Sequence, residues 1–88
     1  MNANFQCTIA TPLGSVFAAS VKRATLLTEA GEITVLANHE PLVALARPGI
    51  ATFELEGIGE KTFMLEKGIV EIRHDGTLLL LVEGAEEK

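Results

Sequence analysis

Turn-forming residues recur about every eight to twelve positions along the chain, and this spacing limits what it can fold into. Glycine, proline, asparagine or aspartate stands at each interruption, where the backbone must reverse or adopt a positive φ. The interruptions lie at residues 12–14, 29–31, 37–41, 47–49, 57–59, 66–68 and 74–76. Short strands at this spacing are typical of a sandwich or a barrel, so the sequence predicts an all-β domain.

Two hairpins are expected in the second half. Residues 50–56 and 61–65 flank a glycine-rich turn. Residues 69–73 and 77–83 flank Asp75-Gly76, a pair that two-residue hairpin turns prefer.

Two apolar stretches need separate interpretation. Residues 78–82 are apolar without a break, which predicts a central strand covered on both faces or covered by a partner. Pro41 is compatible with the start of a helix, but Pro48 leaves only about one and a half turns, too short to be stable alone. We therefore predict a strand over 41–46.

The length of 88 residues fits one domain, which we expect to span residues 1–84, with a frayed, solvated tail over 85–88. The net charge is −5 and the basic residues are scattered, which argues against nucleic-acid binding. The five-residue apolar run falls far short of the roughly 20 residues of a membrane helix, so membrane association is expected only through a partner.

No motif for catalysis or for a cofactor is evident. A phosphate loop, a dinucleotide-binding glycine fingerprint and a zinc-binding cysteine pair are all missing. Cys7 lies in an alternating segment and is expected to face the core. A metal site would need His39 and His74, which lie in different turns, together with a carboxylate such as Glu29 or Glu32. We therefore predict a non-catalytic protein without a bound metal or cofactor.

Residues 29–48 form the densest segment. An acidic turn and a turn carrying Asn38-His39-Glu40 bracket the mainly apolar residues 33–36, which span about 13 Å as a strand. The two turns should therefore lie at opposite ends of the domain unless the chain bends sharply. From the residues alone, these are either two ordinary loops or parts of a binding surface.

This segment resembles the epsilon subunit of the rotary F-type ATP synthase, called delta in mitochondria. The similarity extends in order over nearly the whole chain. The matching residues are Thr11-Pro12, Gly14, Val16-Phe17, Gly31-Glu32-Ile33, Val35, His39, Pro41-Leu42-Val43, Pro48-Gly49 and Gly68-Ile69-Val70-Glu71-Ile72.

The chain departs from the family pattern at three points. Thr34 stands where the family commonly has glycine, and Ala37-Asn38 where it has Pro-Gly before the histidine. Asn38 tolerates the left-handed conformation that glycine would supply. Family members also usually continue into a helical hairpin, to which nucleotide binding and inhibition of ATP hydrolysis belong.

The resemblance implies a ten-stranded β-sandwich of two five-stranded sheets in the central stalk. There the family's domain binds the gamma subunit and rests on the c-ring, coupling proton flow to ATP synthesis. Such a subunit is peripheral to the cytoplasmic face of a bacterial inner membrane, or to the equivalent organellar face. The positions that match the ring side are Glu29, Gly31, Glu32 and His39, and those that match the gamma side are Thr11, Leu42 and Ala44.

Leu42 is the leading candidate for an exposed anchor on gamma because it follows Pro41 and matches the gamma-facing region. The alternative function is a free-standing sandwich that binds a ligand or a regulatory partner. Such a binder would need a concave polar and aromatic site, and the chain has no Trp or Tyr with which to build one.

Overall fold

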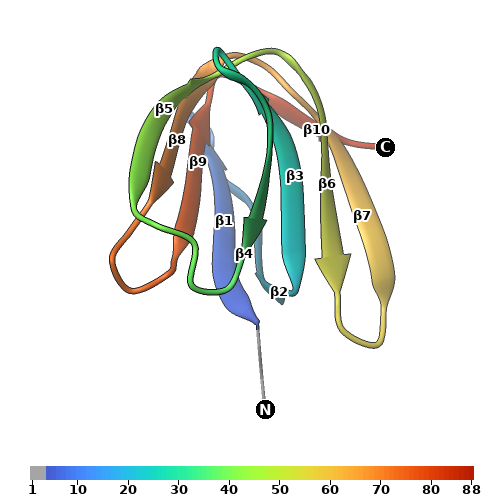
Figure 1. The fold of residues 1–88 in the computed structure, drawn as a ribbon. Helices are drawn as coiled ribbons and strands as arrows, with labels where there is room; N and C mark the ends of the chain where they lie inside the picture. The colour runs from blue at the N-terminus through green and yellow to red at the C-terminus, as the bar shows by residue number, and fades with distance from the viewer. Residues whose placement is uncertain (1–3) are drawn as a thin grey trace.

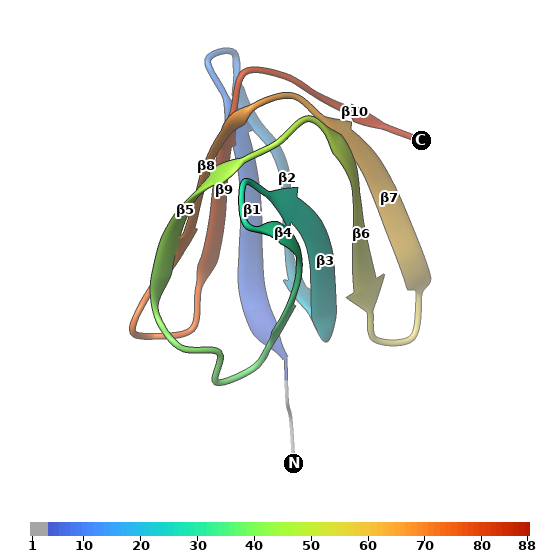
Figure 2. The same ribbon diagram turned by 45° about the horizontal axis from the view of Figure 1, so that its top comes forward.

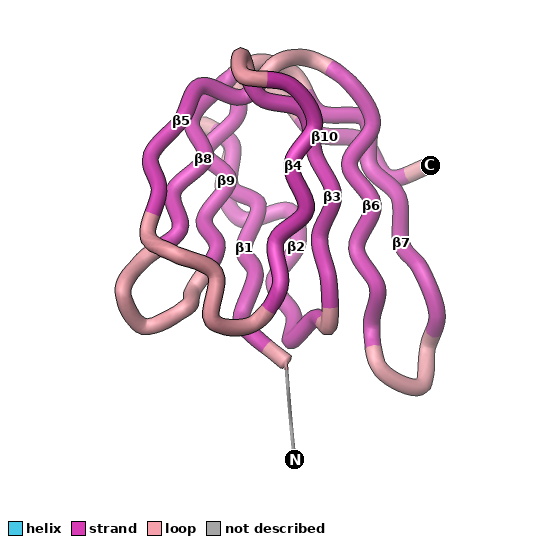
Figure 3. Tube along the Cα trace, viewed as in Figure 1, coloured by secondary structure: helices cyan, strands magenta, loops and turns pink. Residues whose placement is uncertain are grey.

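The computed structural model describes residues 4–88, which form ten strands and no helix (Figure 3). The strands are β1 (Phe5–Thr11), β2 (Gly14–Val21), β3 (Arg23–Thr28), β4 (Gly31–Leu36), β5 (Leu42–Ala46), β6 (Gly49–Leu55), β7 (Gly59–Leu65), β8 (Gly68–Ile72), β9 (Leu78–Val82) and β10 (Ala85–Glu87). The all-β prediction is therefore confirmed. Within the described residues there is also no helix that could cross a membrane.

The strands form two layers (Figure 1). One layer has the order β4-β3-β6-β7-β10 and the other β5-β8-β9-β1-β2. The β3–β5 pairing joins the layers through Thr28 and Ala46, so a single hydrogen-bonded sheet folds over into a sandwich. The predicted sandwich of two five-stranded sheets is confirmed, with this corner as the added feature.

The corner also holds Thr28, which is buried. Its hydroxyl donates to the carbonyl of Gly31 at 2.9 Å and accepts from the amide of Ala30 at 3.1 Å, so the hydroxyl is satisfied. Because a buried hydroxyl without partners is costly, these bonds allow a polar residue where the layers meet.

The inward-facing apolar side chains of alternating strand positions fill the space between the layers. Cys7 and Ile9 on β1 face Phe53 and Phe63 of the other layer in one buried cluster. The Phe17 ring lies 5.3 Å from Phe53 and 5.2 Å from Phe63. Such tilted aromatic pairs add to the stability from burial alone.

Cys7 has no exposed surface, and burial raises the pKa of its thiol to about 12. The predicted packing role is confirmed. Such a thiol is protonated at neutral pH and is a poor nucleophile.

The hairpin predictions are met in different ways. Residues 49–55 and 59–65 pair as predicted. In the second hairpin, Ile72 pairs with Leu78, so residues 73–77 form a longer loop than the expected two-residue turn. The amide of Arg73 donates to the carbonyl of Thr77 at 2.9 Å and closes this loop, and within it the carboxylate of Asp75 accepts from the amide of Thr77 at 2.9 Å. The predicted strand at 41–46 is confirmed as β5.

The expectation of a frayed tail at 85–88 is wrong. Ala85–Glu87 pair with β7, and the amide of Lys88 donates to the carbonyl of Thr62 at 2.8 Å. The free edge of β7 supplies these backbone partners, a long-range pairing that the polar composition of the tail does not reveal. Residues 1–3 of the predicted domain lie outside the described part of the chain.

The leucine run is central, as predicted, because β9 lies between β8 and β1. Leu78, Leu80 and Val82 are buried on its inner face. On the outer face Leu79 is half-buried and Leu81 is 44% exposed. The chain itself therefore covers β9 on one face, and only the expectation of cover by a partner stays open.

Candidate docking surface

Apolar side chains continue across the outer face of the β5-β8-β9-β1-β2 layer. Leu45 lies opposite Ile69, Ile69 opposite Leu81, and Leu81 beside Ala10 of β1. The exposed fractions are 53% for Leu45, 43% for Ile69 and 44% for Leu81. Directly opposite residues in a sheet have neighbouring side chains, so these four form one unbroken row across four strands.

A second row lies beside the first. It runs from Val43 to Glu71, Leu79, Thr8 and Ala18. Val43 is 72% exposed. Glu71 is the charged member of the two rows, and its carboxylate lies 3.7 Å from the Nε of Arg73. We call these two rows the apolar face.

The outer face of the β4-β3-β6-β7-β10 layer is different. Thr34, Thr25, Thr52 and Thr62 lie opposite one another across four strands, so a threonine row crosses this layer. Beside it, Arg23 is paired with Glu54 at 2.7 Å. Exposed apolar residues occur here as the pair Ile50 and Met64, and as Leu36 opposite Arg23. Apolar side chains therefore form a row across four strands on the outer face of the β5-β8-β9-β1-β2 layer, whereas a threonine row crosses the outer face of the other layer.

Exposed apolar surface of this kind commonly marks an interaction site. On β5, the residues expected on the gamma side are Leu42 and Ala44, with Leu42 as an exposed anchor. Leu42 is half-buried and packs against the core, and Ala44 shares its inward face with the buried Ala46. Because alternate strand residues point to opposite faces, Val43 and Leu45 are the outward residues. The expectation that Leu42 is an exposed anchor is therefore wrong.

This placement gives a test of β5. Leu42→Asp is expected to lower the free energy of unfolding by about 1–3 kcal/mol, because the carboxylate would enter an apolar environment without a partner. Leu45→Asp on the same strand is the matched control, and its effect should not exceed about 1 kcal/mol, the cost of aspartate at an exposed strand position. Urea unfolding followed by circular dichroism measures both. Equal losses of stability in the two variants would contradict the assigned faces.

Thr11, predicted on the gamma side, closes the β1–β2 turn. Its hydroxyl accepts from the amide of Leu13 at 3.1 Å and donates to the carbonyl of Gly14 at 3.4 Å. Figure 2 shows this turn rising above the rest of the sandwich. A structural role thus accounts for Thr11, and Leu13 beside it is 99% exposed.

The predicted ring-side residues do not come together. Glu29, Gly31 and Glu32 lie at the β3–β4 turn, whereas His39 follows the far end of β4 (Figure 1). Six strand residues separate the two positions by roughly 20 Å. The expectation that the two turns lie at opposite ends is confirmed, and the four residues do not form one contact patch. Thr11 lies at the Glu29 end and Leu42 at the His39 end.

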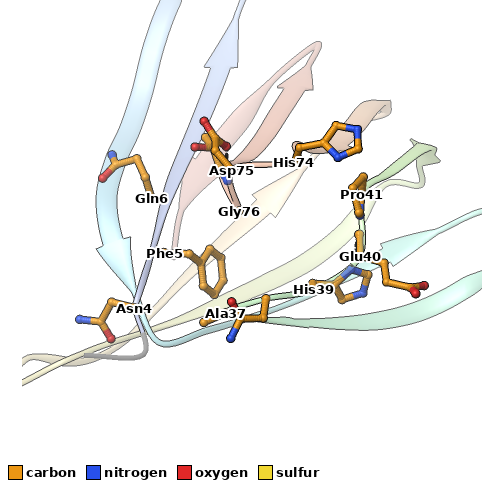
Figure 4. Close-up of a pocket in the computed structure, with 12 residues that line it drawn as sticks. Asn4, Phe5, Gln6, Ala37, His39, Glu40, Pro41, His74, Asp75 and Gly76 are labelled. Carbon is orange, nitrogen blue, oxygen red and sulfur yellow. Dashed lines mark hydrogen bonds between the residues drawn. The ribbon is translucent and has the colours of Figure 1, made fainter. Parts of the chain in front are cut away.

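A hollow of about 610 Å³ opens at the His39 end (Figure 4). His39 and His74 both line it, together with Asp75 and Glu40. The Nδ1 of His39 lies 2.7 Å from the carbonyl oxygen of Glu40, so one ring nitrogen is engaged within the loop. The two histidines are 35 positions apart in sequence. The β4–β5 loop carries His39 and the β8–β9 loop carries His74, and the fold places both at this hollow.

A metal site at this hollow would need three or more ligand side chains. Among residues 4–88, no three His, Cys, Asp or Glu side chains gather in a way that would hold a metal ion. Glu29 and Glu32, the candidate carboxylates, lie at the β3–β4 turn, at the opposite end of β4 from His39, and do not line the hollow.

Comparison with known proteins identifies the family. Residues 4–88 match the family "ATP synthase, Delta/Epsilon chain, beta-sandwich domain". The chain belongs to this family. It is 29% identical over 85 residues to the ATP synthase epsilon chain of Dichelobacter nodosus, covering 97% of this chain and 59% of that one. It is 39% identical over 79 residues to the epsilon chain of Staphylococcus saprophyticus, covering 89% of this chain and 58% of that one.

Solved structures agree with this assignment. A chain of the Euglena gracilis mitochondrial ATP synthase, determined with its OSCP, F1 and c-ring parts, aligns with a TM-score of 0.90 and 25% identity over 99% of this chain and 55% of that chain. A chain of the Tetrahymena thermophila central stalk and c-ring shares the fold, with a TM-score of 0.76 and 18% identity over 93% of this chain and 65% of that chain. This chain thus spans little more than half the length of its epsilon-chain relatives.

Proposed function

We propose that this chain is a non-catalytic central-stalk subunit of an F-type ATP synthase that binds the gamma subunit through the apolar face. The observation that carries the proposal is the unbroken row of Leu45, Ile69 and Leu81 in a domain of the delta/epsilon family. A rotor must transmit torque without slipping, so its parts need a rigid and extended contact. The outer face of a five-stranded sheet supplies one.

The energetics favour this face. A stable complex typically buries about 800 Å² on each partner, with a few central residues dominating the affinity. The backbone at Leu45, Ile69 and Leu81 is already held by strand pairing on both sides of β8, so binding costs little backbone conformational entropy. Val43 extends the same surface toward the free edge of β5.

For the c-ring contact we propose the Glu29 end, with Glu29, Gly31 and Glu32. Gly31 has a φ of 111°, which lets the chain reverse there and present two exposed acidic side chains. His39 lies at the other end of the domain, so we propose that any contact it makes is separate from the one at the Glu29 end. In this arrangement the protein is peripheral to the cytoplasmic face of a bacterial inner membrane, or to the equivalent organellar face, and is held there by the complex.

The direct test is binding to the purified gamma subunit of the same organism. We expect a 1:1 complex by size-exclusion chromatography with light scattering, with micromolar or tighter affinity by calorimetry. Absence of binding at concentrations of about 100 μM would overturn the proposal. It would leave the alternative of a free-standing sandwich with another partner.

A further inference from the structure

Among residues 4–88, four strands have an edge that is wholly or largely unpaired, and three of them carry features that discourage further strand pairing. β10 is only three residues long and contains two glutamates. β4 carries Glu32 with an exposed side chain. β5 lies between Pro41 and Pro48 and is tied to β3 at Ala46. The fourth edge strand, β2, has eight residues with no charge and no proline.

The backbone of β2 is paired on one side only. It pairs with β1, and no other strand among residues 4–88 bonds to it. The register is regular from Phe17 opposite Ile9 to Val21 opposite Phe5, and a bulge interrupts it between Ile9 and Ala10. Alternate residues of an antiparallel edge strand direct their N–H and C=O groups away from the partner. The segment Phe17–Val21 therefore presents a regular, unpaired strand edge.

The side chains of this segment also leave room for another strand. On the inner side, Phe17 and Ala19 pack against the core but remain half-buried. On the outer side, Ala18 and Ser20 are exposed and small. An added strand would cover the open flank of Phe17 and Ala19 with apolar side chains, and it could place large side chains beside Ala18.

We infer that β2 accepts an extended segment of the gamma subunit, the partner proposed above to cover the apolar face. The β5-β8-β9-β1-β2 sheet thereby gains a sixth strand from that partner. The inference rests on the proposed function. Its occupant is an extended segment, because only an extended backbone matches the repeat of N–H and C=O groups along a sheet edge.

Continuity of the surface supports this occupant. Ala18 lies opposite Thr8, which lies beside Leu79 in the second row of the apolar face. A partner seated on that face therefore reaches β2 without crossing a charged residue. The bound strand should be uncharged where it faces Phe17 and Ala19, because a charge placed there would lose its hydration.

Hydrogen exchange of the full chain, alone and bound to gamma, tests the inference. We expect the β2 amides that exchange rapidly in the free protein to slow by at least about tenfold in the complex, because they gain a backbone partner. The amides of β4, an edge strand of the other layer, are the internal control and should not change. Ala18→Lys should also weaken binding, and Thr34→Lys on β4 should not.

The other outcomes separate the two proposals. If the complex forms and the fast β2 amides stay fast, the added strand is wrong while the docking function stands. If gamma does not bind at all, both proposals fail. If β2 is already protected in the free protein and sedimentation gives the mass of a dimer, the edge belongs to a second copy of this chain, which overturns the inference.

Discussion

Leu81→Asp is expected to weaken binding to the gamma subunit by about 100-fold or more, while the domain keeps its fold. Central anchors of an interface typically contribute about 2 kcal/mol or more, and a carboxylate buried there without a partner adds a desolvation cost. Leu81 lies between Ile69 and Ala10, in the middle of the first row of the apolar face. Calorimetric titration of gamma measures the loss.

The matched control is Ile50→Asp. Ile50 and Leu81 are both 44% exposed on the outer faces of strands, but Ile50 lies on the other layer. Introducing aspartate in an exposed strand should cost both variants a similar, small amount of stability, up to about 1 kcal/mol. If Ile50→Asp impairs gamma binding and Leu81→Asp does not, the docking surface is the threonine-rich face and our assignment is wrong.

Gly68→Val is expected to destabilise the domain by about 3 kcal/mol or more. A Cβ at this position would overlap the carbonyl oxygen of Leu81 and lie 2.6 Å from the Cα of Val82. These are backbone atoms, so no rotamer change relieves the overlap and β8 must move away from β9. Since 1 kcal/mol shifts the melting temperature of a domain this size by about 4–8 °C, a loss of at least about 10 °C should follow.

Gly84→Ala is the control for this variant. A Cβ at Gly84 would also meet a close neighbour, but that neighbour is the end of the Glu66 side chain, which can swing into solvent. Its effect should stay within about 0.5 kcal/mol. Differential scanning calorimetry compares the two proteins. A Gly68→Val protein that melts like the wild type would show that β8 and β9 adapt, and that close approach is not why glycine stands there.

Much of the architecture could be predicted from local patterns. Turn residues bounded β6 and β7, because glycine between two apolar segments leaves few alternatives to a hairpin. Pro41 and Pro48 limited the intervening segment to a length that suits a strand and not a helix. The alternation around Cys7 placed its thiol inside, where it lies.

The members of the candidate surface on β5 could not be predicted from sequence, because the local pattern does not show which side chains of this strand face inward. Leu42, Val43, Ala44 and Leu45 are all apolar, so alternation says that neighbours point to opposite faces without saying which face is inside. The pairing of Ala46 with Thr28 at the corner between the layers decides it. Ala46 is buried there, which turns Leu42 and Ala44 inward and leaves Leu45 outside.

What the sequence by itself determined is the set of strands, the turns between them and the presence of more apolar strand positions than one face can hide. What the tertiary structure decided is which of those positions face solvent, which strands form edges and which distant loops meet. Strand propensity and turn chemistry act over a few residues, so the sequence displays them directly. Three features depend on contacts between residues far apart in the chain. They are the choice of which β5 side chains face inward, the pairing of residues 85–87 with β7, and the placement of His39 and His74 around one hollow. Only the complete set of strand pairings fixes those contacts, because a shift of one residue would exchange the two faces of a strand.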